Sequence, residues 1–100
     1  MAAELIIAPE AQQDLDEAYR WYYKCLGIEE RIGDEHGQAL TLHQLGMVAE
    51  LRGSTDEAIA FYSQAEALLV RLDDPYTLGI VQESLARAQE NLAAATEGDA

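Results

Sequence analysis

The chain aligns with itself at an offset of forty residues, and this internal repeat constrains its fold more than any other feature. Asp16-Glu17-Ala18 recurs as Asp56-Glu57-Ala58, and Trp21-Tyr22 aligns with Phe61-Tyr62. Repeats of roughly 20–50 residues are typical of solenoid proteins, whose units bury their hydrophobic faces on one another. The 100 residues therefore predict a single repeat domain of about two and a half units, with no room for a second core.

Apolar residues at three- and four-residue spacing predict that every unit is helical. Asp34 and Asp74 are expected to cap two helix starts, and Gly53 is expected at a helix end. Ser54 and Glu57 have the spacing of a capping box. These signals divide the chain into a leader over residues 1–8 that is extended or loosely ordered, a first helix over 9–33, a complete unit over 34–73, a terminal helix over 74–95 and a frayed tail over 96–100.

Between about Leu15 and Gln89 the chain resembles the tetratricopeptide repeat family, in the longer form found in many bacterial regulatory and scaffold proteins. The resemblance rests on residues at helix-packing positions and at the turn between the helices, namely Leu45, Gly46, Gly53, Ala58, Tyr62 and Ala65. The family unit is a helix–turn–helix of about 34 residues, lengthened here to forty. The resemblance implies an all-α fold in which antiparallel helix hairpins form a short right-handed solenoid of about 2.5 repeats.

The third unit departs from the family pattern at two positions. Asp73 stands where the first unit has Gly33, and Ala86 stands where the second unit has Gly46. Because the third unit also lacks a second helix, we expect the last helix to be a solvent-facing cap.

The resemblance also implies a non-catalytic protein-interaction module, because first helices of such units line a concave groove that holds a peptide or a partner helix. Glu50 and Glu90 share one repeat position and are expected to form an acidic ladder in it. We therefore expect the groove to favour a basic or amphipathic protein segment. The expected groove residues are His43, Gln44, Met47, Glu50 and Leu51 of the middle unit and Glu83, Ser84, Arg87, Glu90 and Asn91 of the last helix.

Four aromatic residues form a second candidate surface. Tyr19, Trp21, Tyr22 and Tyr23 project over more than one face of the first helix, so they cannot all pack inside so short a chain. We expect them to mediate self-association as a homodimer, with the N-terminal segment exchanged between copies. In the alternatives, the leader folds back over these aromatics, or the chain is part of a longer array whose only ligand is itself.

Composition excludes several other functions. The net charge of −13 opposes binding to nucleic acid and to anionic membranes. No apolar stretch approaches the roughly 20 residues that a membrane helix needs. The single cysteine, Cys25, cannot form an internal disulfide. The start of the chain does not resemble a signal peptide. We therefore expect a cytoplasmic protein.

Catalytic and metal-binding signals are weak. His36 and His43 are seven residues apart, too far for two imidazoles to share a metal on one helix. Cys25 has no helical neighbour that could act as a base. We therefore predict no enzymatic activity, no metal and no cofactor. A distant third hypothesis is a ParE-type toxin, which the residues from Leu5 to Tyr23 resemble locally, but no antiparallel sheet or basic cluster follows.

Overall fold

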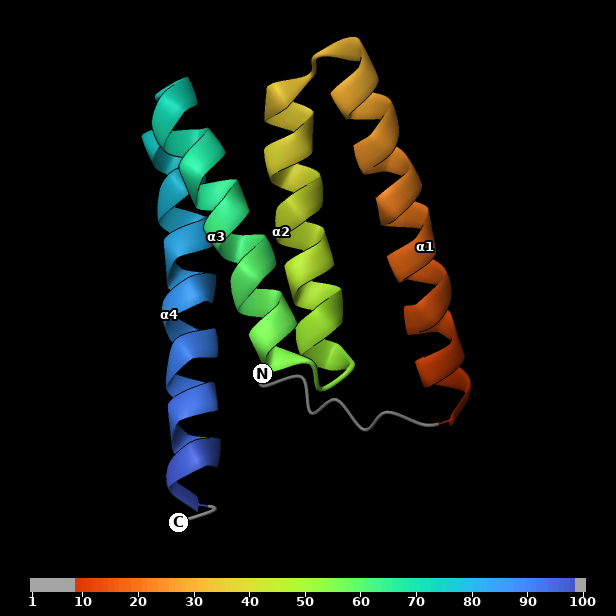
Figure 1. Cartoon of the computed structure of the whole chain (residues 1–100), viewed down its shortest axis with the longest axis vertical. Coiled ribbons are helices and arrows are strands. Elements are labelled where there is room, and N and C mark those ends of the chain that lie inside the picture. The colour runs from red at the N-terminus through yellow and green to blue at the C-terminus, as the bar shows by residue number, and fades with distance from the viewer. Residues whose placement is uncertain (1–8, 99–100) are drawn as a thin grey trace.

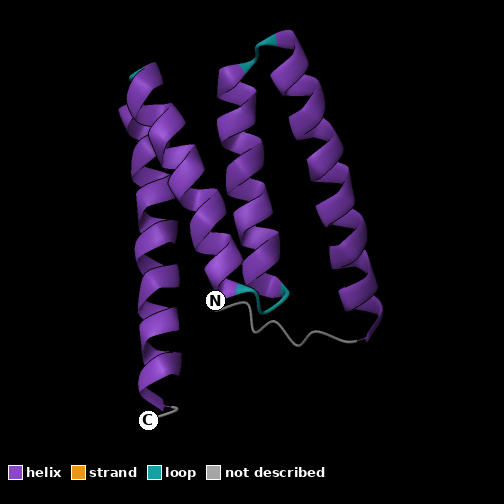
Figure 2. Ribbon diagram, in the orientation of Figure 1, coloured by secondary structure: helices purple, strands orange, loops and turns teal. Residues whose placement is uncertain are grey.

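A computed structural model describes residues 9–98. These residues form four helices, α1 (Pro9–Ile32), α2 (Glu35–Leu51), α3 (Thr55–Leu72) and α4 (Pro75–Gly98), and no strand. Consecutive helices run antiparallel and each packs on the next, so that α2 and α3 occupy the middle of the array (Figure 1; Figure 2). The prediction of an all-α helical solenoid is confirmed.

Local cap chemistry explains two of the helix starts. A carboxylate oxygen of Asp34 accepts a hydrogen bond from the Gly37 amide at 2.9 Å, and Asp74 accepts one from the Thr77 amide at 3.2 Å. Each of these bonds satisfies an amide that has no partner within its own helix. Both predicted caps are therefore confirmed.

The predicted capping box at Ser54 is wrong. The Ser54 side chain makes no capping hydrogen bond. The amide of Glu57, which the hydroxyl would have bound, donates instead to the carboxylate of Asp56 at 2.9 Å. The adjacent acid therefore takes the amide that the Ser54 hydroxyl would have bound.

Left-handed residues end the helices and turn the chain. Gly33 and Gly53 have φ angles of 75° and 83°, and Asp73 has a φ of 56°. Asp73 occupies the repeat position of Gly33, so the same backbone geometry recurs at the end of the next unit although a side chain is present. A residue with a Cβ atom is disfavoured in this region, although Asp tolerates it better than most.

The hydrophobic core lies between α2, α3 and α4, and Leu26 joins it from α1. Its largest fully buried side chains are Tyr62, Leu45, Leu69 and Val81. Gly46 lies directly beneath the ring of Tyr62, where an added Cβ atom would collide with ring carbons. The absence of a side chain at Gly46 therefore lets α2 and α3 approach closely.

Two segments differ from the expected boundaries or fall outside the structure. Helix α4 continues to Gly98, beyond the expected end near Ala95. Within the extension the Thr96 hydroxyl donates to the Leu92 carbonyl at 3.0 Å. The predicted leader over residues 1–8, with any exchange or folding back of it, and the last part of the predicted tail at 99–100 lie outside the described residues.

Candidate functional site: the face between α2 and α4

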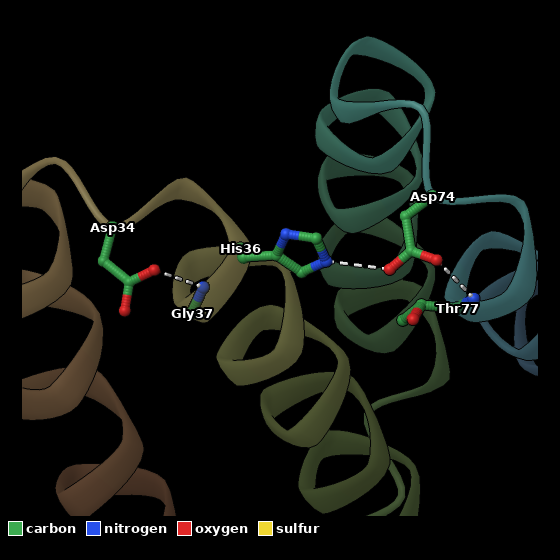
Figure 3. A network of polar contacts seen from close by, with 5 residues as sticks. All are labelled: Asp34, His36, Gly37, Asp74 and Thr77. Carbon is green, nitrogen blue, oxygen red and sulfur yellow. Dashed lines mark hydrogen bonds and ion pairs between the residues drawn. The ribbon is translucent and has the colours of Figure 1, made fainter.

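A line of polar contacts joins α2 to α4, and its first contact lies where both helices begin. The imidazole Nε2 of His36 lies 2.8 Å from a carboxylate oxygen of Asp74. The other oxygen of Asp74 accepts the bond from the Thr77 amide (Figure 3). These two hydrogen bonds, with the Thr77 bond as the larger cause, lower the pKa of Asp74 to about 2. One carboxylate therefore caps α4 and ties it to α2.

The second and third contacts follow at intervals of seven residues along α2. His43 Nε2 lies 3.0 Å from the hydroxyl of Ser84, and Glu50 accepts a hydrogen bond of 2.7 Å from the Arg87 guanidinium. The Tyr62 hydroxyl donates to the same Glu50 oxygen at 2.5 Å. A spacing of seven residues returns to nearly the same side of a helix. These contacts therefore fix α2 against α4 along their length.

A hollow of about 480 Å³ opens beside the third contact. Met47 and Leu51 supply its apolar lining, and Glu50 and Arg87 supply its polar lining. The Met47 side chain is 41% exposed, so it is accessible to a partner. We call this surface, from His43 to Leu51 on α2 and from Glu83 to Asn91 on α4, the α2–α4 face.

The distribution of charge on the α2–α4 face differs from the expected acidic ladder. Glu50 is not a free carboxylate, since Arg87 and Tyr62 both bind it. Glu83 and Glu90 are exposed. Glu50 and Glu90 share one repeat position, but Arg87 neutralises Glu50. The unpaired negative charge therefore lies along α4 alone.

The remaining predicted groove residues take different environments. Ser84 is buried and half of the His43 side chain is covered, whereas Gln44 and Asn91 are exposed. Burial lowers the pKa of His43, and the nearby Arg87 guanidinium lowers it further, against a smaller opposite effect of Glu50. The neutral imidazole is therefore the favoured form of His43 in the folded protein. His43 and Ser84 hold the two helices together, and Gln44 and Asn91 face solvent.

The four aromatic residues of α1 divide into two environments. The rings of Tyr19 and Tyr23 are tilted against each other, with centroids 5.1 Å apart, and both make edge-to-face contacts with Phe61 in α3. Tyr22 is half-buried against the core. Trp21 is 65% exposed. The chain therefore packs three of these aromatics at least in part, and Trp21 stands apart from them.

Sequence reasoning missed Tyr62 as a member of the site. The family pattern marks Tyr62 only as a packing residue, yet its hydroxyl helps to hold Glu50. Tyr62 and Glu50 lie twelve residues apart on different helices, so no local sequence pattern predicts this bond.

In the part of the chain that the structure describes, no group of three or more His, Cys, Asp or Glu residues could hold a metal ion. None of the described helices is long and apolar enough to cross a membrane.

Comparison with known proteins gives one match. Residues 5–69 match the family model for the tetratricopeptide repeat. Neither the curated proteins nor the solved structures compared with the chain gave a match. The matched residues include α2 and most of α3, the hairpin whose close contact depends on Gly46.

Proposed function

Because the chain belongs to the tetratricopeptide repeat family, we propose that it is a protein-interaction module that holds a basic or amphipathic segment on its α2–α4 face. The family match supports the general role, since such repeats serve as protein-interaction modules and not as catalysts. The observation that carries the finer proposal is the apolar hollow at Met47 and Leu51, which lies beside the exposed acids of α4.

The hollow favours an apolar anchor from the partner. Met47 is flexible and polarisable, and such side chains adapt to ligands of irregular shape. Arg87 lies at the edge of the hollow, but Glu50 already binds its guanidinium. A partner carboxylate would have to compete with Glu50 for Arg87. An acidic peptide is therefore a poor ligand at this point of the face.

The surrounding charge favours a basic partner. Glu83 and Glu90 are exposed on α4 with no ion pair among the described residues, and the whole chain carries a net charge of −13. A field of this sign raises the rate at which a cationic segment meets the face, and salt screens the attraction. A cytoplasmic location, in which Cys25 stays reduced, agrees with this proposal.

Isothermal titration calorimetry tests the proposal with two amphipathic peptides that share their leucines and differ only in carrying lysine or glutamate. The lysine peptide should bind, and the glutamate peptide should not. Replacing Glu83 and Glu90 together with Gln should weaken binding of the lysine peptide by about twofold to thirtyfold, because each exposed charge contributes about 0.2–1 kcal/mol. Equal binding of the two peptides would show that charge does not select the partner.

A second pair of variants tests the apolar hollow separately. Met47→Ser removes part of the apolar lining and leaves the charge unchanged. It should therefore weaken binding of the lysine peptide by the same factor at low and at high salt. Val70→Ser is the matched control, because Val70 is an exposed apolar residue on α3 outside the α2–α4 face. If Val70→Ser weakened binding as much as Met47→Ser, the peptide would not be using the hollow.

A further inference from the structure

The repeat provides an internal template for the surface of α1. Helices α1 and α3 are the second helices of successive units, since Trp21-Tyr22 aligns with Phe61-Tyr62. Helix α3 packs on α2, the first helix of its own unit. No described helix precedes α1. The contacts that α3 makes with α2 therefore show what a first helix placed beside α1 would cover.

The equivalent residues differ in burial in the way that this template predicts. Phe61 is 6% exposed, whereas Trp21 is 65% exposed. Tyr62 is fully buried between Gly46 and the Glu50–Arg87 pair, whereas Tyr22 is only half-buried. Trp21 and Tyr22 of α1 are thus less buried than the equivalent Phe61 and Tyr62 of α3.

Helix α4 presents the complementary surface. It is the first helix of the third unit, equivalent to α2, and no described helix packs on it as α3 packs on α2. Ala86 is equivalent to Gly46, and Glu90 is equivalent to Glu50. Ala86 and Glu90 are both exposed. The small residue and the carboxylate that receive Tyr62 in the middle unit therefore recur on α4 without an aromatic partner.

We propose that copies of this chain associate head to tail, with α1 of one copy packing on α4 of another as α3 packs on α2. A second copy is the occupant of the exposed α1 surface, because α1 and α4 of this chain carry at equivalent repeat positions the residues that pack together between α3 and α2. The two surfaces are different, so the contact is heterologous, and a third copy can add to either end of a dimer.

The template specifies the contacts across this interface. The ring of Tyr22 should lie over Ala86 and face Glu90, the positions equivalent to Gly46 and Glu50. Phe61 is covered by the preceding second helix, where it meets Tyr19 and Tyr23. The positions of α3 equivalent to those two tyrosines are residues 59 and 63. Trp21 of the incoming copy should therefore lie on α3 of the first copy.

Two features make this association reversible. An added Cβ atom at Gly46 would collide with the Tyr62 ring, and Ala86 carries such an atom, so α1 and α4 cannot approach as closely as α2 and α3. Two chains of net charge −13 also repel each other. Salt screens this repulsion. We therefore expect association to strengthen with salt, whereas binding of a basic peptide should weaken with it.

Sedimentation velocity over a series of protein concentrations tests the proposal, with Trp21→Asp to disable the α1 surface and Ala86→Arg to disable the α4 surface. Both residues are exposed, so both variants should fold, which circular dichroism checks. The unmodified chain should form dimers and larger species as concentration rises, and each variant alone should remain monomeric. An equimolar mixture of the two variants should form dimers and nothing larger, since each retains one intact surface.

Other outcomes would overturn the head-to-tail contact. A symmetric dimer through α1 would survive Ala86→Arg and would not be restored by mixing. An unmodified chain that stays monomeric at all concentrations and salt levels would exclude association, and protection of its Trp21 from a soluble fluorescence quencher would identify the chain's own terminus as the cover. The Trp21→Asp variant should stay monomeric with its α2–α4 face intact. Peptide binding measured on this variant therefore tests the proposed function independently of self-association.

A gain of association provides a more specific test. Ala86→Gly should increase the association constant about tenfold, because it removes the methyl group that overpacks the interface. Ala95→Gly is the matched control, since Ala95 is an exposed alanine of the same helix and lies nine residues from Ala86, on the opposite side of α4. Both variants weaken their own helix, but only Ala86→Gly should promote association. If the two variants behaved alike, Tyr22 would not pack on Ala86.

Discussion

The ring of Tyr62 occupies the space that a side chain at Gly46 would fill. This contact lets α2 and α3 pack closely enough for the Tyr62 hydroxyl to reach Glu50. Glu50 in turn binds Arg87 on α4. A single missing side chain thus sets the geometry of the hairpin and, through Tyr62 and Glu50, the position of the next helix.

Gly46→Ala should therefore destabilise the protein by about 1–3 kcal/mol, because the added methyl group overpacks a full core. Gly27→Ala is the control, since nothing lies within 4 Å of a Cβ atom placed at Gly27. It should stabilise the protein by up to about 1 kcal/mol through helix propensity alone. Urea denaturation measures both free energies of unfolding. A stabilising Gly46→Ala would contradict the close contact.

Tyr62→Phe should lower the free energy of unfolding by about 1 kcal/mol, the usual net contribution of one hydrogen bond. The ring still fills its site above Gly46, so no cavity forms. Glu50 keeps its ion pair with Arg87, so no unpaired charge is left behind. Chemical denaturation of the variant beside the unmodified chain measures the difference, and a loss as large as that of a cavity mutant would show that the ring has moved.

His43 should make stability depend on pH near neutrality. Burial and Arg87 lower its pKa in the folded protein, so the unfolded chain binds the proton more readily. The stabilising effect of the neutral imidazole is therefore present above the ordinary His pKa of about 6.5 and is lost as pH falls below it. Thermal unfolding of the unmodified chain and of His43→Gln between pH 7.5 and pH 5.5 (about two units around that value) should show a smaller decrease for the variant. Equal slopes would place the responsible proton elsewhere.

Asp73→Gly should stabilise the protein by up to about 1 kcal/mol. Glycine relieves the left-handed conformation at φ 56°, although it gives the unfolded chain more conformational freedom. It also removes a negative charge from the C-terminal end of α3, where the helix dipole opposes it. Asp73→Asn separates the two causes in the same denaturation experiment, since it removes only the charge. No gain from either substitution would mean that the strain is relieved by other contacts.

The position of each helix could be predicted from the sequence because the signals are local. The apolar spacing within each segment and the Asp34 and Asp74 caps depend on residues a few positions apart, whose relative geometry a helix fixes. Ser54 is the exception, because its hydroxyl had to compete with the neighbouring Asp56 for one amide. Competition between two plausible acceptors is decided by geometry, which sequence spacing does not contain.

The electrostatic character of the α2–α4 face was decided by the tertiary structure. A helical repeat protein with an excess of negative charge and an acid at position 50 could be predicted from the residues alone. Only the packing of α2 against α3 and α4 brought Tyr62 and Arg87 to Glu50. A pairwise contact between residues on different helices depends on crossing angles and side-chain volumes, here on the absent side chain of Gly46. For that reason the fold followed from the repeat, whereas the pairing of its charges followed from the packing.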